Sequence, residues 1–279
     1  MRLDDQRRSS NIEDRRGGGG FGLPVIGGGI GTVIILIIAA IFGINPRQLV
    51  QQGNPPAQQQ APANPASTTD PQVDFVAAVL GDTEDVWHDY FRQRVGSDYQ
   101  EPHLVLFSGA VQSACGFAQS ATGPFYCPLD QKVYIDLSFY RELKSRFQAP
   151  GDFAQAYVIA HEVGHHVQNL LGTSDKVHQL EQRASEREAN ALSVKLELQA
   201  DCYAGIWANH AQKMKNVLEA GDVEEALNAA SAIGDDRLQM QSRGYVTPDS
   251  FTHGTSEQRV AWFKRGFEGG ELQNCETFR

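Results

Sequence analysis

The sequence lacks a surplus of positive charge and shows no internal repeat. Its 279 residues include 24 Lys and Arg against 34 Asp and Glu, which gives a formal net charge of −10. Six of the basic and four of the acidic residues precede Gln48, so the remainder carries 18 against 30, a net charge of −12. An acidic chain of this kind is a poor ligand for nucleic acid or anionic lipid surfaces, and we exclude nucleic acid as a partner.

Cysteine is scarce, and its spacing lacks the C-x-x-C element of common structural zinc sites. The four cysteines are Cys115, Cys127, Cys202 and Cys275. In an exported domain an even number of cysteines indicates disulfides, and four cysteines allow three pairings. We expect Cys115–Cys127, which closes a short loop, and then Cys202–Cys275, which ties the C-terminal segment to the helix that carries Glu197. A zinc site formed by all four cysteines is the alternative, and the spacing disfavours it.

Charged residues are absent from Gly17 to Pro46. Within this stretch, Val25 to Ile44 consists of twenty apolar or small residues with a single Thr. A helix of that length rises about 30 Å, the thickness of the hydrocarbon core of a bilayer. The alternative is a secretory signal peptide, whose apolar core is shorter and is followed by a small-x-small cleavage site. We predict an uncleaved transmembrane helix at 25–44, in contact with the lipid bilayer and preceded by a Gly-rich lead-in at 17–24.

Basic residues near this helix lie almost entirely on its N-terminal side. Residues 1–16 contain five Arg, whereas Arg47 is the only basic residue between the helix and Arg92. Positive charge is enriched on the cytoplasmic side of membrane helices. The sequence therefore predicts a single-pass membrane protein in which residues 1–16 form a cytoplasmic tail and the remainder lies outside the cytoplasm.

Aromatic residues are absent from Gln48 to Thr69, which is almost wholly Gln, Pro, Ala, Asn, Ser and Thr. A segment of this composition cannot bury enough apolar surface to fold. We predict a disordered linker over residues 45–72, and a folded domain over residues 73–279.

Hydrophobic periodicity divides this domain into helices and a small sheet. Helices are expected over 75–91, 138–147, 152–171, 174–213 with one break, 223–242 and 257–266. Strands are expected at 104–107 and 132–136, with a loop at 116–128 between them. Strand 132–136 is either a sheet edge that holds an extended peptide or an interior strand. The predicted fold class is α+β and mainly helical, with the small sheet ahead of helix 152–171.

We expect Asp152 to be the N-cap of helix 152–171 and Gly172 to end that helix.

The stretch His161-Glu162-Val163-Gly164-His165 has the form H-E-x-x-H and lies within helix 152–171. His161 and His165 are one turn apart, so both imidazoles face the same side and can reach one metal ion. Glu162 projects about 100° around the axis from His161, beside the ion. From there it can take a proton from a metal-bound water, as a zinc hydrolase requires.

A catalytic zinc usually takes three protein ligands, so a further ligand is needed downstream. Glu197 and Asp201 are four residues apart in a segment rich in helix formers and share one helical face. Glu197 is our candidate for the third ligand, with Asp201 as the alternative. In the favoured arrangement Asp201 accepts a hydrogen bond from the rear nitrogen of a ligating His.

The chain resembles the neutral zinc metallopeptidase family of bacterial membrane-anchored proteins. The resemblance rests on six segments of the outer domain: Cys115-Gly116, Gly123 to Pro128, Val133 to Leu137, His161 to Gln168, Glu197 to Cys202 and His253 to Arg259. It implies a zincin-like domain with peptidase activity. Together with the predicted helix at 25–44, it indicates a protein of the bacterial inner membrane whose domain binds one zinc ion and is periplasmic or extracellular. The Glu-x-x-x-Asp segment also resembles that of the gluzincins, which implies that Glu197 is a ligand and that Asp201 supports His161.

Other residues near these motifs have less defined roles. His253 and Tyr245 are candidates for stabilising the oxyanion of a tetrahedral intermediate, or for a hydrogen bond that orders a loop. Arg259 either binds a peptide carboxylate or pairs with Glu257 or Glu271. His166 points away from the metal and is interpreted as a packed or surface residue.

The sequence therefore predicts a zinc peptidase that acts on proteins or peptides of the cell envelope. Two alternatives stay open: a zinc-stabilised binding or scaffold domain without turnover, and a zinc amidase that acts on cell-wall peptides. Glu162 favours an enzyme, because a structural zinc has no need of a base and usually has four Cys or His ligands.

Overall fold

The structure is a computed structural model that describes residues 1–16, 64–65 and 70–278. The predicted transmembrane helix at 25–44 and most of the predicted linker lie outside these residues. Among the helices that the structure describes, none combines the length and the apolar character needed to cross a membrane.

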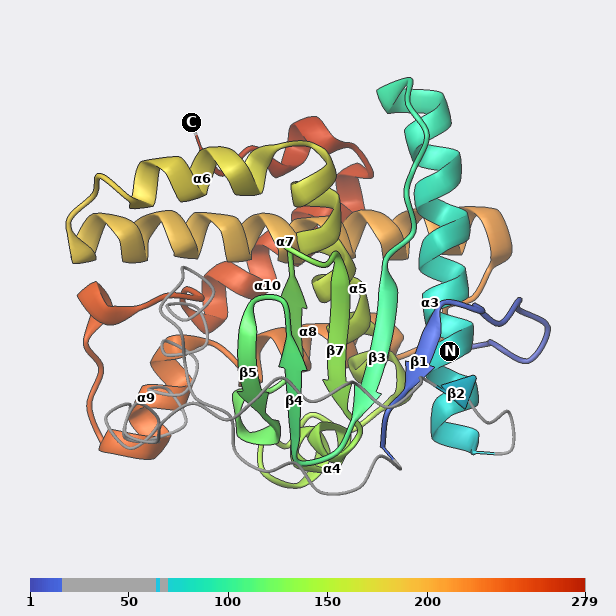
Figure 1. Ribbon diagram of the computed structural model, residues 1–279, viewed down its shortest axis with the longest axis horizontal. Helices are drawn as coiled ribbons and strands as arrows, with labels where there is room; N and C mark the ends of the chain where they lie inside the picture. Colours follow the sequence, from blue (N-terminus) through green and yellow to red (C-terminus); the bar gives the residue numbers. More distant parts are fainter. Residues whose placement is uncertain (17–63, 66–69, 279) are drawn as a thin grey trace, which may run out of the picture.

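Helices dominate the fold and pack on one side of a small sheet, and the mainly helical α+β class agrees with the sequence prediction (Figure 1). The helices are α3 (Pro71–Tyr90), extended by a π-helical turn at Phe91–Val95, α4 (Ser138–Ser145), α5 (Asp152–Leu170), α6 (Thr173–Glu181), α7 (Glu186–Lys215), α8 (Asp222–Ala232), α9 (Asp235–Arg243) and α10 (Ser256–Gly269). The strands are β1 (Ile12–Asp14), β2 (Asn64–Pro65), β3 (His103–Phe107), β4 (Ala110–Ser113), β5 (Gly116–Gln119), β6 (Phe125–Cys127) and β7 (Lys132–Asp136).

The main sheet has the order β2-β1-β3-β7-β6, and β4 and β5 form a separate hairpin. Strands β1, β3 and β7 run parallel, while β6 runs antiparallel to β7 at one edge. Strand β7 is therefore interior, which decides between the two alternatives left open for residues 132–136. The edge strand beside it is β6, in a segment that we expected to be a loop.

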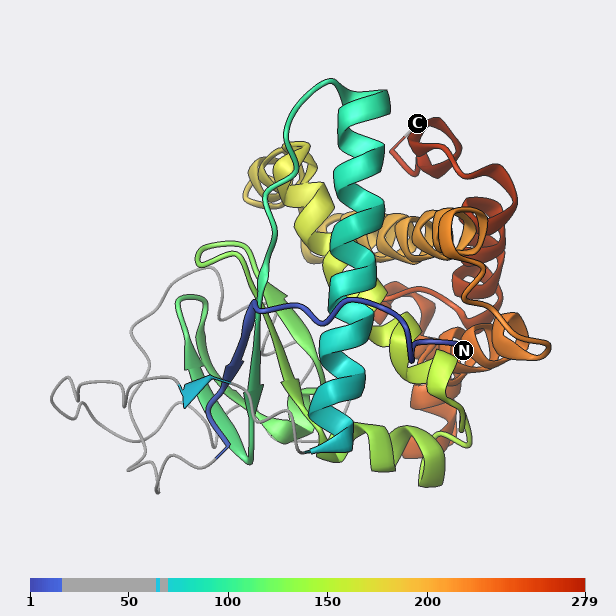
Figure 2. The same cartoon turned by 90° about the vertical axis from the view of Figure 1, so that its right-hand side faces the viewer.

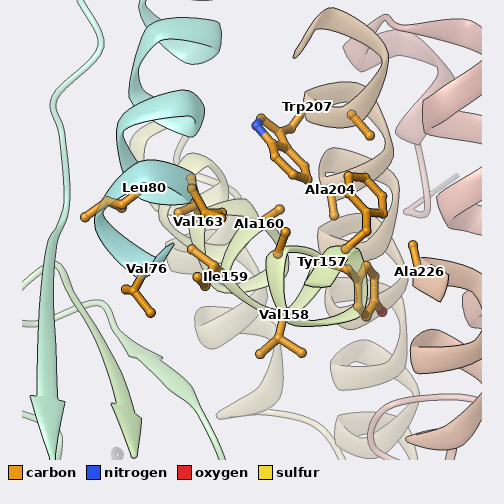
Figure 3. Close-up of a cluster of buried hydrophobic side chains, with 14 of the residues drawn as sticks. Val76, Leu80, Tyr157, Val158, Ile159, Ala160, Val163, Ala204, Trp207 and Ala226 are labelled. Carbon is orange, nitrogen blue, oxygen red and sulfur yellow. The ribbon is translucent and has the colours of Figure 1, made fainter. Parts of the chain in front are cut away.

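Helix α5 lies at the centre of the hydrophobic core, between α3 and α7 (Figure 3). Its apolar residues Ile159, Ala160 and Val163 are fully or almost fully buried. Gly164 permits the close approach of α7, because a Cβ atom there would lie 2.9 Å from the carbonyl oxygen of Ala200. This contact brings the helix that carries His161 and His165 against the helix that carries Glu197.

Residues 1–16 do not form a tail separate from the folded domain, contrary to the domain division expected from the sequence. Ile12 to Asp14 form strand β1, which pairs with Leu104 to Leu106 of β3. Met1, Leu3 and Ile12 belong to the same buried cluster as α3 and α5. The sequence signal was weak here, because β1 has only three residues and needs a distant strand to form.

The structure also corrects several expected elements. Residues 116–128 contain β5 and β6 where we expected a loop. Residues 223–242 form two helices, because the chain breaks at Ile233 and Gly234 between α8 and α9. The long helical stretch after Gly172 breaks at 182–185, and Ser185 begins α7 with a capping box to Glu188. The N-cap of α5 is Gly151, one residue before the expected Asp152.

Candidate metal centre

Two histidines and one glutamate converge between α5 and α7. His161 and His165 lie one turn apart on α5, and Glu197 faces them from α7. One ligand atom from each residue lies within 4.8 Å of the others, and in the described part of the chain no fourth Cys, His, Asp or Glu joins this group. Glu162 and Asp201 stay outside it. The structure thus brings together the three residues expected to be ligands.

The distances within this group match the space that a zinc ion needs. Glu197 carboxylate oxygens lie 3.2 Å from Nε2 of His161 and 3.4 Å from Nε2 of His165. Ligand bonds of 2.0–2.1 Å in a tetrahedron place neighbouring ligand atoms about 3.3 Å apart. The two distances lead to different oxygens of Glu197, and the three side chains are close enough for one metal ion to contact all of them.

The rear nitrogen of each imidazole has its own hydrogen-bond acceptor. Nδ1 of His161 donates to Oδ1 of Asp201 at 2.9 Å, and Nδ1 of His165 donates to Oε1 of Gln168 at 2.8 Å. The amide of Gln168 is oriented by its own donation to the carbonyl oxygen of Leu196 at 2.7 Å. Both Nε2 lone pairs are thereby directed to the carboxylate of Glu197.

This arrangement requires positive charge between the imidazoles and Glu197. A neutral Nε2 lone pair and a carboxylate oxygen are both acceptors, so a proton or a metal cation must lie between them. Burial by itself would lower the pKa of His161, but Asp201 and Glu197 outweigh burial and raise this pKa to about 10. The same pairing, with the charges of His165 and His253, holds the pKa of Glu197 well below its usual value despite burial. The donor set thus suits a divalent cation.

Asp201 lies at the centre of a buried polar network behind the site. Arg259 of α10 donates to both of its oxygens, from Nε at 2.8 Å and from a terminal nitrogen at 2.9 Å. The hydroxyl of Tyr157 also donates to Asp201. Burial would raise the pKa of Asp201, but Arg259 and His161 lower it to about 2. Asp201 therefore stays ionised and can orient His161.

Arg259 lies in this network and also lines the adjacent cavity, so its predicted binding of a peptide carboxylate stays a prediction. Its guanidinium is buried with Asp201 and pairs with neither Glu257 nor Glu271. The roles of Tyr157, Gln168 and Arg259 behind the site were missed. Gln168 lies three residues after His165, on the same face of α5, and this spacing was the available signal.

Glu162 lies beside the ligand group and lines the adjacent cavity. Its side chain is buried, and burial raises the pKa of Glu162 above its usual value. A carboxylate with a raised pKa is better matched to accepting and returning a proton near neutral pH.

The cavity has a volume of about 440 Å³ and an apolar wall next to the polar site. Besides His161, Glu162, His165 and Glu197, its lining includes the following apolar side chains: Phe139, Phe147, Val158, Val177, Leu196 and Leu238.

Of the two residues proposed for the oxyanion, the structure brings only His253 to the cavity. The carboxylate of Asp235 accepts hydrogen bonds from the backbone nitrogens of residues 252–254, which holds this loop against the site. Tyr245 has an exposed fraction of 61% and is not among the residues that line the cavity, so the described part of the chain gives its predicted role no support.

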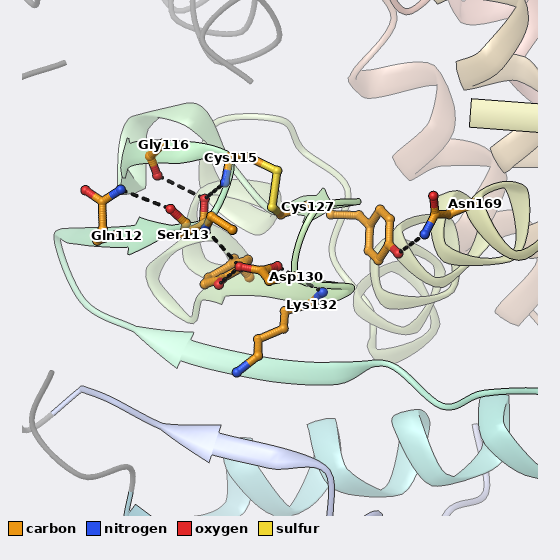
Figure 4. Close-up of a disulfide and its surroundings, with 11 residues drawn as sticks. Gln112, Ser113, Cys115, Gly116, Cys127, Asp130, Lys132 and Asn169 are labelled. Atoms are coloured by element: carbon orange, nitrogen blue, oxygen red, sulfur yellow. Dashed lines mark hydrogen bonds between the residues drawn. A yellow bond between two sulfur atoms is a disulfide. The ribbon is translucent and has the colours of Figure 1, made fainter. Parts of the chain in front are cut away.

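Both expected disulfides are present. Cys115–Cys127 joins the hairpin end to edge strand β6, and Cys202–Cys275 joins α7 to the C-terminal segment. Figure 4 shows the first disulfide, and Asn169 of α5 donating to the hydroxyl of Tyr126 at 3.1 Å. The same hydroxyl lies 3.0 Å from Nδ1 of His166. His166 is fully buried, which confirms the packed position, one of the two that we expected for it. These contacts fix β6 against α5.

Comparison with known proteins identifies the group to which this chain is related. The family described as "Putative neutral zinc metallopeptidase" matches residues 1–278. The chain belongs to this family. The resemblance noted in the sequence is thereby confirmed, and membership implies zinc and a hydrolase.

Two relatives of this chain carry no activity in their names. It is 52% identical over 286 residues to "Uncharacterized protein YpfJ" of Escherichia coli K12, covering 100% of this chain and 99% of the relative. It is 45% identical over 190 residues to "Uncharacterized protein Rv2575" of Mycobacterium tuberculosis H37Rv, covering 64% of this chain and 63% of the relative. No solved structure matches it.

Proposed function

We propose that the protein is a zinc-dependent peptidase in which His161, His165 and Glu197 hold a single zinc ion. The observation that carries this proposal is the group of three potential ligands beside Glu162 and the cavity. Among the described residues no further Cys, His, Asp or Glu joins this group, so a bound zinc ion would keep an open position for water. Structural zinc sites usually fill all four positions with protein ligands, so an open position favours catalysis. When bound, zinc supplies a Lewis acid that polarises a carbonyl and makes water more acidic.

The residues of the chain divide the remaining work. Glu162 acts as general base toward the attacking water and then as general acid toward the leaving amine. Asp201 and Gln168 keep Nδ1 of His161 and His165 protonated, so that each Nε2 faces the ion. Arg259 keeps Asp201 ionised. His253, on the cavity wall, is the candidate for stabilising the oxyanion.

We further propose that the substrates are proteins or peptides of the cell envelope with bulky apolar side chains near the cleaved bond. The apolar wall of the cavity supports the side-chain preference, because burying such a side chain there contributes about 1.5–3 kcal/mol. Two disulfides support an oxidising compartment outside the cytoplasm. We propose attachment to the bacterial inner membrane through the apolar stretch 25–44.

The decisive experiment compares the full-length protein with its Glu162→Gln variant. We expect the variant to retain one zinc ion per chain and to lose casein cleavage by at least about 100-fold, because general-base catalysis typically contributes 10²–10⁴. Glu268→Gln, an exposed change on α10, is the matched control and should cleave normally.

Peptidoglycan is digested alongside casein to distinguish a peptidase, a cell-wall amidase and a scaffold domain without turnover. Cleavage of casein alone supports the peptidase, and Glu162-dependent release of peptidoglycan peptides without casein cleavage supports the amidase. If the zinc-loaded protein cleaves neither substrate nor a peptide library, the scaffold function is correct.

A further inference from the structure

The N-terminal segment, residues 1–16, is bound to the domain at both of its ends and in its middle. Figure 2 shows it running from β1 across α3 toward α5 and α8. Its backbone hydrogen-bonds to three separate elements: to β3 through the β1 pairing, to Ala77 of α3 at 2.9 Å and to Val217 after α7 at 2.8 Å.

Helix α3 is shaped to receive this segment. A Cβ atom at Gly81 would lie 2.7 Å from the carbonyl oxygen of Arg7 and 3.1 Å from the backbone nitrogen of Ser9. Only glycine allows the segment to cross α3 at this distance without displacement of the backbone.

A buried carboxylate of α3 depends on the same segment. Glu84 is completely buried, and its hydrogen bonds come from Arg7 at 2.7 Å, Ser9 at 2.6 Å and Asn11 at 2.9 Å. All three partners come from residues 1–16, so the segment both covers this carboxylate and satisfies its hydrogen bonds. The contact is therefore part of the fold.

Three of the five arginines of the segment form ion pairs with the domain. Arg7 pairs with Glu84 and Asp85, Arg8 pairs with Asp74, and Arg16 pairs with Asp70. These are three of the five charges from which the sequence predicted a cytoplasmic tail. In the structure these arginines bind the segment to α3, so they are poor indicators of the side of the membrane on which the segment lies.

The amino group of Met1 lies at the start of α5. The amino group of Met1 is fully buried and lies 2.7 Å from Asp152, 3.3 Å from Glu219 and 3.4 Å from Asp222. Both ends of the segment, Met1 and β1, are thus fixed to the domain.

We propose that residues 1–16 and the metallopeptidase domain lie on the same side of the membrane. A hydrocarbon core about 30 Å thick cannot separate groups that are in hydrogen-bond contact. It follows that the expected arrangement, with residues 1–16 in the cytoplasm and the domain outside it, is replaced by one in which both parts lie on one side of the membrane. This proposal does not depend on peptidase activity.

The test places single cysteines in the full-length protein and labels them with a membrane-impermeant maleimide. Asp5→Cys reports on the N-terminal segment, and Lys213→Cys and Lys144→Cys report on the domain, because all three positions are exposed. Labelling is measured in spheroplasts, before and after the membrane is disrupted with detergent, where each cysteine should react fully.

We expect the three cysteines to behave alike, whether all react before disruption or all react only after it. A different result for Asp5→Cys, such as labelling only after disruption while both domain positions react before it, would overturn the proposal.

Discussion

Two groups of potential metal ligands along α5 make an informative comparison. Midway along the helix, His161 and His165 meet Glu197. At its N-terminus, Asp152 meets Asp222 and Glu225. In both groups the potential ligand atoms lie within 4.8 Å of one another, so distance alone would make each a candidate metal site.

The chemistry of the two groups differs. The first combines two imidazoles and one carboxylate, each imidazole with an acceptor behind it, and needs a cation between its members. The second contains only carboxylates, which a helix N-terminus favours, and the amino group of Met1 already lies against Asp152 and Asp222. Proximity therefore does not define a metal site: donor type and the charge already present decide which cation binds.

The largest expected effect concerns zinc itself. His165→Ala removes one of three ligands, and we expect zinc content to fall from about one ion per chain to nearly zero. Asp222→Asn, in the second group, should leave zinc content unchanged. Elemental analysis of the purified variants measures both, and loss of zinc in Asp222→Asn would contradict the distinction between the groups.

Asp201→Asn should produce the next largest effect, because it leaves the guanidinium of Arg259 buried without its counter-charge. We expect the metal-free protein to lose about 3–5 kcal/mol of unfolding free energy. Zinc affinity should fall by about 10–100-fold, since the support of His161 is lost. Urea unfolding and zinc titration test these outcomes, with exposed Asp249→Asn as control. An unchanged midpoint would show that the network is not stabilising.

In the second group, Asp222→Asn weakens the contact with the buried Met1 amino group. Hydrogen bonds to charged groups contribute about 1.5–3 kcal/mol, and we expect a loss of this order in thermal or urea unfolding. Glu224→Gln, exposed on the same helix, should change stability by less than about 0.5 kcal/mol. Equal effects of the two changes would mean that the Met1 contact contributes nothing.

The smallest effect is the response of the N-terminal segment to acid. Hydrogen bonds from Arg8 and Arg16 of the segment lower the pKa values of Asp74 and Asp70 of the domain below 3.8 in the folded protein. Their stabilisation is therefore complete above about pH 3.8 and is lost as the pH falls below it. We expect amide exchange of residues 1–16 to increase on acidification before that of α5, and simultaneous exchange would contradict this order.

Local patterns predicted the elements that carry the chemistry. The spacing of His161 and His165, and that of Glu197 and Asp201, placed each pair on one helical face, and Gly172 marked the end of the metal helix. Helical periodicity needs no knowledge of the rest of the fold. Short strands were missed, because β5 and β6 lie in a segment rich in turn-forming residues and form only against a partner.

The sequence by itself determined the metal helix, the two histidines with their neighbouring glutamate, and the candidate third ligand, since these follow from a 3.6-residue period and the preferences of zinc. Only the tertiary structure decided that Arg259 supports the site, that Tyr245 lies away from it, and that Met1 reaches the start of α5. Those relations join residues far apart in the chain, and they depend on how closely helices and strands pack, which no local pattern encodes.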